Sequence, residues 1–481
     1  MHPLKNTSPT FIKIQDMNNK YFCFIQTLTL ILCCLSYMLV FFYRYTPTVL
    51  TNQLSKSLNV TKDRISVFSS MYFWTYAAMQ PIGGILSDVL SPGKLISLST
   101  LISATGSIMM GESSNFGLAC FARCLVGVGC GPIFVSSIRL IANWYSPTGY
   151  AIANGILLTM GATGGCLAQG PLSTLCEVID WKWAFRISTI IGFFISIICF
   201  FFIKTKASDY GFDTLEYLKI ESKKEEPKEF NLASASLIDD VDDNNYNPLH
   251  KHSICQSLKN NVKQSFENLK IVIKTPQVYV FIIWDIFAPS CYYNMAGLWG
   301  SRYFQEVMDV KKKTADYWIL VISLSVIVGG LLFPPISNLT HSRKWVLCIS
   351  TFIGMLSALG FVFINHNIGS WSVLILMFLF GLGSNGNIPI LNTLIKETNY
   401  DVAGTMLGFI NFFPFFSTGI LQILSPVFIN WAEPKDHSPD IDTHSPRAYQ
   451  YGLWLTITVY LTISTISTLF MKETYKGNNH D

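Results

Sequence analysis

Charged side chains are scarce in this sequence. Only 13% of its 481 residues are Asp, Glu, Lys or Arg, whereas a soluble globular protein carries roughly 25%. The chain therefore has too little charge to cover a water-exposed surface, which argues against a soluble enzyme. The net charge of +4 is too small to indicate a polyanionic partner, so we expect no nucleic-acid binding.

Motifs for metal binding, disulfide frameworks and ATP hydrolysis are also missing. Most of the 12 cysteines lie in apolar segments, where cysteine behaves as a small hydrophobic residue, and no CxxC spacing occurs. A Walker A loop is absent. The segment Gly381–Gly386 matches GxGxxG, but it lies inside an apolar segment with no preceding strand, so it predicts no dinucleotide site. We expect no catalytic residues, metal or cofactor, and no enzymatic activity.

Long apolar segments are abundant instead. Half of the residues (50%) are hydrophobic, and several segments approach the ~20 residues that cross a bilayer. We predict an all-α polytopic membrane protein with twelve transmembrane helices, at residues 22–43, 66–87, 95–111, 116–140, 150–172, 184–204, 277–299, 316–337, 345–364, 370–393, 402–430 and 449–471. The first segment lacks a small-residue cleavage site, so we interpret it as an anchor and not a signal peptide.

These segments divide the chain into two bundles of six helices. The predicted divisions are a cytosolic tail at 1–21, a bundle at 22–204, a cytosolic loop at 205–275, a second bundle at 276–471 and a cytosolic tail at 472–481. The positive-inside rule places both termini in the cytosol, and either the plasma membrane or an endolysosomal membrane fits. Within the loop, residues 253–274 predict a basic amphipathic helix on the membrane face, with a charged linker as the alternative.

The two halves share weak internal similarity. Gly127 and Gly129 correspond to Gly381 and Gly383, about 250 residues later. Similar offsets relate Gly83-Gly84 to Gly329-Gly330 and Asn59-Val60 to Asp309-Val310. Several matches at nearly one offset predict two related six-helix halves.

Three segments of the N-terminal half resemble motifs of a known family. Residues Gly84–Lys94, GILSDVLSPGK, resemble the signature of the major facilitator superfamily between its second and third helices, although Val89 replaces the usual arginine. Residues 122–132 resemble the fourth helix of that family, and the glycines of 155–170 resemble the fifth. The resemblance implies twelve helices in two pseudo-symmetric bundles and transport by alternating access.

The resemblance also assigns structural and gating residues. It implies that Asp88 pairs with Arg139 and caps the helix near 401–405, so that Asp88, Lys94 and Arg139 form a conformational gate. A solvated loop acid is the alternative for Asp88. Arg123 matches a position found across members with different substrates, which favours a packing role. Gly161 and Gly165, four residues apart, are expected to allow close helix packing.

Arg44 is the leading candidate for substrate binding. It follows the first apolar segment beside Tyr43, and a charged side chain at membrane depth predicts a functional role. A guanidinium group suits carboxylate or phosphate. The segment loosely resembles organophosphate transporters, but their second arginine is replaced here by Tyr292-Tyr293-Asn294. The alternative is that Arg44 extends to the outer interface.

A few other polar residues lie inside predicted helices. Asp285, about nine residues into the seventh helix, is the candidate for proton coupling, with a structural hydrogen bond near Pro289 as the alternative. The residues predicted to line the substrate cavity, together with Arg44 and Tyr43, are Gln80, Gln169, Tyr293, Asn294, Asn385 and Asn387. Helix-to-helix hydrogen bonding would explain the amides equally well.

These observations predict a transporter that moves a small polar solute, with an organic anion preferred because of Arg44. The alternative within this class is a carrier of neutral or zwitterionic solutes such as peptides, amino acids or sugars, coupled to protons through Asp285. A transporter-like nutrient sensor that signals through residues 205–275 is the alternative from another class. The expected partners are the lipid bilayer, a small-molecule substrate and a coupling proton, and the transport unit is expected to be a monomer.

Overall fold

The all-α fold expected from the sequence is confirmed by a computed structural model of the chain. The structure describes residues 9–61, 63–145, 147–205, 210, 263–264, 267–364, 369–399, 402–434 and 443–475, and these contain helices and connecting segments but no strand. The prediction for residues 253–274 lies mostly outside this described part. Of that segment, residues 267–274 form a helix that meets the following helix at 82°.

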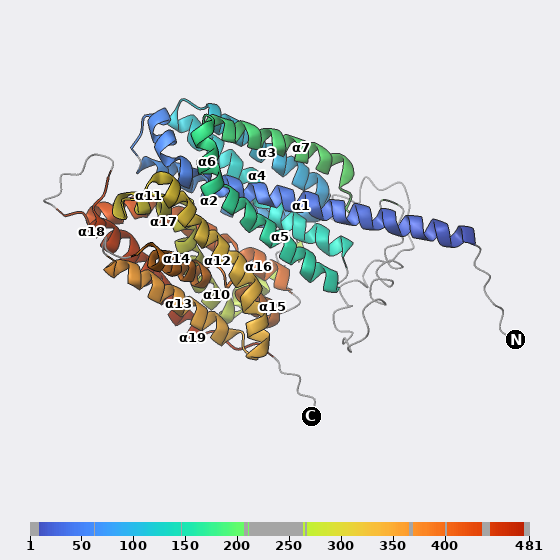
Figure 1. Ribbon diagram of the computed structural model, residues 1–481. Helices are drawn as coiled ribbons and strands as arrows, with labels where there is room; N and C mark the ends of the chain where they lie inside the picture. Colours follow the sequence, from blue (N-terminus) through green and yellow to red (C-terminus); the bar gives the residue numbers. More distant parts are fainter. Residues whose placement is uncertain are drawn as a thin grey trace.

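The helices form two groups that lie side by side (Figure 1). The N-terminal half contains α1 (Pro9–Leu58), α2 (Arg64–Val89), α3 (Pro92–Glu112), α4 (Phe116–Trp144), α5 (Pro147–Leu167), α6 (Gly170–Val178) and α7 (Lys182–Phe202). The C-terminal half contains α10 (Pro276–Asn294), the π-helical turn η3 (Met295–Trp299), α11 (Gly300–Val307), α12 (Lys312–Leu339), α13 (Lys344–Phe363), α14 (Ser370–Ser384), α15 (Ile388–Thr398), α16 (Ala403–Ile410), α17 (Phe412–Trp431), α18 (Pro446–Ala448), the π-helical turn η5 (Tyr449–Trp454) and α19 (Leu455–Leu469).

The predicted count of twelve spans is not reproduced by helix length and hydropathy alone. Within the described residues, nine helices are long and apolar enough to cross a membrane, or ten if the bent pair that ends at Val307 is one span. The predicted span 150–172 is not one helix, because the chain breaks at Gln169 (φ −102°, ψ −108°) between α5 and α6. The predicted span 370–393 is likewise interrupted between α14 and α15, and α1 continues past residue 43 to Leu58.

The internal repeat is visible in the backbone. Asn59, after α1, and Asp309, after α11, both have the left-handed φ angle that most residues avoid, 51° and 50°. The paired glycines also make equivalent contacts. A Cβ on Gly127 would meet Thr75 and the Tyr72 carbonyl, and one on Gly381 would meet Ser325 and the Ile322 carbonyl, at the same offset of about 250 residues. Each half therefore packs its second and fourth helices together through small residues.

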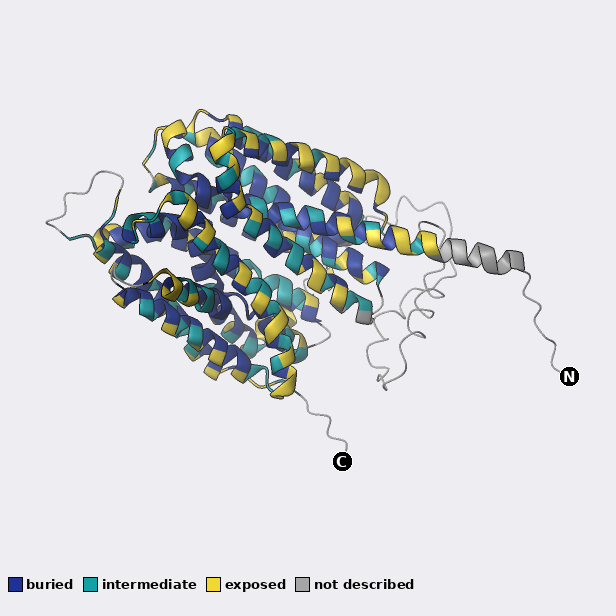
Figure 2. Cartoon of the chain, in the orientation of Figure 1, coloured by how far each residue is buried: buried dark blue, intermediate teal, exposed yellow. Residues whose placement is uncertain are grey.

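Surface burial follows the pattern expected of a protein in lipid. Buried residues face the spaces between helices, and exposed residues run along the outer faces of the bundles (Figure 2). Many of these exposed residues are large and apolar, including Phe194 and Phe201 on α7. Such faces would be costly in water and suit a hydrocarbon environment.

The glycines of α5 bring that helix against α1. A Cβ on Gly161 would lie 2.6 Å from the Tyr37 ring, and one on Gly165 would lie 2.7 Å from the Tyr45 ring. At Gly164 it would lie 2.0 Å from the main-chain oxygen of Met38. A side chain at Gly164 would therefore meet backbone, which cannot rotate away.

This contact predicts opposite effects for one substitution at two positions of α5. Gly164→Ala is expected to lower stability by about 1–3 kcal/mol because it overpacks the interface. Gly155→Ala, where a Cβ meets nothing within 4 Å, should be neutral or stabilising by up to about 1 kcal/mol, because alanine favours helix. The melting temperatures of the purified variants test this, and equal shifts at the two positions would contradict the close contact.

Candidate functional site

Arg44 lies buried between the two halves, at 1% exposure. Its guanidinium carbon lies within 6 Å of five aromatic ring centroids, those of Phe41 (4.5 Å), Tyr76 (4.8 Å), Phe415 (4.9 Å), Tyr293 (5.1 Å) and Tyr72 (5.7 Å). Three of these rings come from the N-terminal half and two from α10 and α17 of the C-terminal half. Arg44 therefore does not extend to the membrane interface, and both halves enclose it. These five rings are called the aromatic box below.

The positive charge of Arg44 has no counter-ion within the described residues. Its Nε and Nη2 groups are buried without a hydrogen-bond partner, and the polar groups that act on it electrostatically are tyrosines. A second buried guanidinium, that of Arg123, lies over the Tyr72 ring at 4.7 Å. Burying two guanidinium groups without a carboxylate partner is energetically costly, and binding of an anion would reduce this cost.

The conformation of α1 explains why Arg123 is needed there. Pro47 lies within α1 and has no N–H group, so the carbonyl of Tyr43, four residues earlier, loses its helical hydrogen bond. Arg123 replaces it, because its Nη1 donates to the Tyr43 oxygen at 2.5 Å and its Nη2 donates to the Arg44 oxygen at 3.1 Å. Arg123 thus holds the backbone that carries Arg44.

Tyrosines of α10 complete the site from the other half. The Tyr45 hydroxyl donates to the Tyr292 hydroxyl at 3.3 Å across the interface, and Tyr293 belongs to the aromatic box. Asp285 lies two turns earlier on the same face of α10, about 12 Å along the helix axis. It is 6% exposed, and none of the described residues hydrogen-bonds to its carboxyl group. The predicted coupling residue is therefore buried on α10, two turns before the tyrosines that reach Arg44.

The other predicted lining residues separate into two groups. Gln80 and Gln169 do join the halves: Asn411 donates to Gln80 Oε1 at 3.0 Å, and Ser323 donates to Gln169 Oε1 at 3.0 Å. The remaining residues are buried within one half. Tyr43 donates to the Ser188 carbonyl, Asn294 to Ser425, and Asn387 to Ser350, Thr351 and the Gly383 carbonyl, while Asn385 ends α14.

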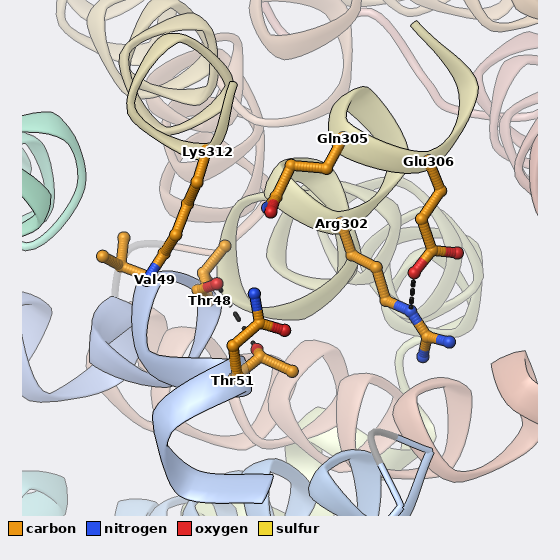
Figure 3. Close-up of a pocket in the computed structure, with 8 residues that line it drawn as sticks. Thr48, Val49, Thr51, Arg302, Gln305, Glu306 and Lys312 are labelled. Atoms are coloured by element: carbon orange, nitrogen blue, oxygen red, sulfur yellow. Dashed lines mark hydrogen bonds and ion pairs between the residues drawn. The ribbon is translucent and has the colours of Figure 1, made fainter. Parts of the chain in front are cut away.

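The end of the molecule opposite the two termini is closed by charged contacts. This distal end lies away from the N and C labels in Figure 1. Asp63, between α1 and α2, pairs with Arg302 of α11 at 2.7 Å and with His444 at 3.3 Å. Arg302 also pairs with Glu306 at 2.8 Å. Arg302 and Glu306 line a cavity of about 60 Å³ between α1, α11 and α12, and Figure 3 shows both side chains.

The environment of Asp63 keeps it charged. Burial by itself raises the pKa of the Asp63 carboxyl, but the hydrogen bond with His444 and the charge of Arg302 outweigh burial and hold that pKa well below its ordinary range. A depressed pKa means that the contact contributes fully above the ordinary pKa of aspartate and is lost only as the pH falls through the lowered value. Asp63 is therefore ionised throughout the neutral range.

Asp63→Asn is expected to open the distal end. A hydrogen bond to a charged group contributes about 1.5–3 kcal/mol, so the open population should rise by about tenfold or more. A cysteine introduced at Asn52, which lines this cavity, should then react faster with a membrane-impermeant maleimide. Asp309→Asn, an exposed acid in the equivalent turn of the other half, is the matched control and should leave the rate unchanged. Equal rates in both variants would count against this closure.

The gate predicted from the family signature stays a prediction. The side chain of Asp88 lies outside the described residues. Lys94 and Arg139 are both exposed, on α3 and α4. The distal contacts were not foreseen, because Asp63 is separated from Arg302 by 239 residues and from His444 by 381. The aromatic box was missed for the same reason, although the spacing of Tyr72 and Tyr76 on one face of α2 could have indicated part of it.

Comparisons with known proteins agree with this arrangement. The profile of the Major Facilitator Superfamily matches residues 33–421. The probable sulfoacetate transporter SauU of Cupriavidus necator is 22% identical over 186 residues, which are 39% of this chain and 43% of that protein. The hexuronate transporter of Bacillus subtilis is 22% identical over 156 residues, 32% of this chain and 37% of that protein. The chain thus matches less than half the length of these curated relatives.

Solved structures extend the similarity over the whole fold. A bacterial homologue of the human lysosomal transporter Spinster, in an inward-facing and unoccupied conformation, superimposes with a TM-score of 0.63 at 14% identity. The superposition covers 93% of this chain and 96% of the homologue. At this identity the likeness supports the fold and not a shared substrate.

Proposed function

Because the chain belongs to the major facilitator superfamily, we propose that it is a transporter that carries a small organic anion across a membrane by alternating access, without changing it chemically. The anion binds at the guanidinium group of Arg44. The proposal rests on one observation: the Nε and Nη2 atoms of Arg44 are buried and have no hydrogen-bond partner among the described residues. They lie at the interface that opens and closes during alternating access. A carboxylate or sulfonate would accept both hydrogen bonds and neutralise the charge.

The names of the relatives support the same substrate class. Sulfoacetate and hexuronate, the solutes in the names of two relatives, are organic anions. The aromatic box adds an apolar surface on which the body of the anion can lie. Tyr45 and Tyr292, which already bond across the interface, can donate hydroxyl groups to the same ligand.

The membrane arrangement is part of the proposal. With both termini in the cytosol, as the distribution of Lys and Arg predicts, the distal end faces the outside of the cell or the lumen of an organelle. The contacts of Asp63 and Arg302 then close the outer side. A single chain encloses Arg44 from both halves, so one copy is a complete transport unit.

Ligand-induced stabilisation of the purified protein tests the substrate class. A ligand that binds the folded state raises its melting temperature, and the rise grows with the logarithm of the ligand concentration above the Kd. Sulfonates and carboxylates should stabilise the protein, and neutral sugars and zwitterionic amino acids of similar size should not. Counterflow of the stabilising anion in proteoliposomes then separates a transporter from a sensor. Stabilisation by neutral or zwitterionic solutes alone would overturn the anion assignment.

A second candidate function has one observation in its favour. Asp285 is a buried carboxyl group on the face of α10 that carries Tyr292 and Tyr293, where it could carry a proton with a neutral or zwitterionic solute. In that case Asp285→Asn would abolish accumulation driven by a proton gradient, while exchange of the same solute would continue.

A further inference from the structure

A second buried carboxyl group lies at the junction of the halves, away from Arg44. Asp316, one turn into α12, is 0% exposed. The Ser173 hydroxyl of α6, in the other half, faces this carboxyl group. Beside it, the hydroxyl groups of Thr174 and Tyr317 lie 3.2 Å apart. Asp316 therefore lies on a surface that must separate when the distal end opens.

The carboxyl group is incompletely partnered in this closed arrangement. The Ser301 hydroxyl of α11 donates to Oδ1, whereas Oδ2 is buried with no hydrogen-bond partner in the part of the chain that the structure describes. Lys312 lies one turn earlier on α12, but its ammonium group donates to Gln53 Oε1 of α1 at 2.9 Å. The charge of Lys312 therefore acts on Asp316 from nearby, but among the described residues the two side chains form no ion pair.

Apart from Lys312, the described groups around Asp316 add no positive charge that pairs with it. Cys176 on α6 is a thiol near the same junction. Glu177 is also acidic, and it pairs with Lys313 at 2.9 Å on the exposed side of α6 and α12. From α11, the group that faces the carboxyl is the Ser301 hydroxyl. A carboxylate at this position would thus be fully buried, with the Ser301 and Ser173 hydroxyls and a lysine nearby but no ion pair, and complete burial disfavours its charged form more than these groups favour it.

We propose that Asp316 is a proton-binding site that links closure of the distal end to the pH of the solution on that side. When α6 and α12 meet, the carboxylate takes one proton and becomes a neutral carboxylic acid, whose O–H can donate to Ser173. When they part, water reaches the group and the same proton returns to the same side. Protonation of Oδ2 gives the carboxyl group an O–H donor and removes its negative charge.

The sign of the pH dependence follows from this linkage. Protonation favours the closed form, so acid on the distal side stabilises closure, and closure weakens as the pH rises. One proton shifts the equilibrium between closed and open forms by up to about tenfold per pH unit. In the proposed orientation, an acidic exterior or lumen holds the carrier open toward the cytosol. The site does not touch Arg44, so it is independent of which anion is carried.

Hydrogen–deuterium exchange of the full-length protein without substrate tests the proposal. After correction for the intrinsic effect of pH on exchange, residues 170–178 and 312–320 should exchange several-fold more slowly at about pH 5.5 than at about pH 8. In Asp316→Asn, which imitates the neutral acid, both segments should exchange slowly at both pH values. Asp180→Asn, at an exposed acid just beyond α6, makes the same chemical change and should keep the wild-type dependence.

Two further variants distinguish titration of Asp316 from titration of another group at the distal end. Ser301→Ala removes the hydrogen bond that favours the charged carboxylate, so the midpoint of the pH dependence should move to higher pH, which a merely structural role would not cause. It also remains informative if Asp316→Asn does not fold. His444→Gln removes the titratable ring beside Asp63 and should leave the dependence in place.

Three results would contradict a proton site at Asp316. The proposal is overturned if Asp316→Asn keeps the wild-type pH dependence, or if His444→Gln is the only variant that loses it. It is also overturned if the slow exchange requires sodium and does not depend on pH. Because the measurement uses no substrate, a failure of the anion assignment at Arg44 leaves its outcome unchanged.

Discussion

Arg44→Gln is expected to reduce the affinity for the anionic substrate by at least about a hundredfold, since hydrogen bonds to charged groups contribute about 1.5–3 kcal/mol each and both donors are lost. Arg44→Lys keeps the charge but loses the planar fork, so it should retain a weak, intermediate affinity. The concentration dependence of ligand-induced stabilisation gives these affinities, and initial rates of counterflow give the corresponding loss of transport.

The matched control is the same substitution at an exposed arginine. Arg186→Gln removes an ion pair with Glu112 at the surface of the N-terminal half, and it should change neither affinity nor transport. Arg44→Met provides an independent check. Because it removes a buried and unpaired charge while keeping most of the side-chain volume, it should raise the melting temperature even though it abolishes binding. An Arg44→Gln variant that binds the anion normally would contradict the assignment.

Arg123→Met is expected to have the second large effect, through the conformation of α1. It leaves the Tyr43 carbonyl, which has no helical donor because of Pro47, without the guanidinium group, and a buried unsatisfied group costs about 1–3 kcal/mol. The Arg44 carbonyl loses its second donor. The protein should be destabilised accordingly. Because these carbonyls belong to the backbone that positions Arg44, the affinity for the anion should also fall.

A second substitution separates this mechanism from a general loss of charge. Pro47→Ala restores a main-chain N–H group that can donate to the Tyr43 carbonyl, as in a regular helix. Arg123→Met should therefore cost less in the Pro47→Ala background than in the wild type. Melting temperatures of the four proteins form a double-mutant cycle. Strictly additive effects would show that Arg123 does not compensate for the proline.

The fold was largely predictable because hydrophobicity and small-residue spacing are local properties of the chain. The apolar segments located the helices, and the repeated glycines identified two related halves, whose second and fourth helices make equivalent contacts at Gly127 and Gly381. Helix breaks were less predictable. The interruptions at Gln169 and after Asn385 occur inside apolar segments, where surrounding helices satisfy the freed backbone groups.

For the site, the sequence identified single residues but not their partners. Arg44 and Asp285 could be named because a charge inside an apolar segment is conspicuous by itself. Asp316 was not singled out, because it follows three lysines at the start of a segment and resembles a residue at the membrane surface. Its complete burial became visible only once α6 and α11 were packed around it.

The sequence by itself determined that this chain is a membrane protein with two related halves and a charged residue, Arg44, directly after its first apolar segment. The tertiary structure decided that five rings from both halves surround Arg44, that Arg123 replaces the hydrogen bond lost at Pro47, and that Asp63 meets Arg302 across the interface. The physical reason is that helix formation in lipid depends on the composition of each segment, whereas the environment of a buried charge depends on side chains hundreds of residues away.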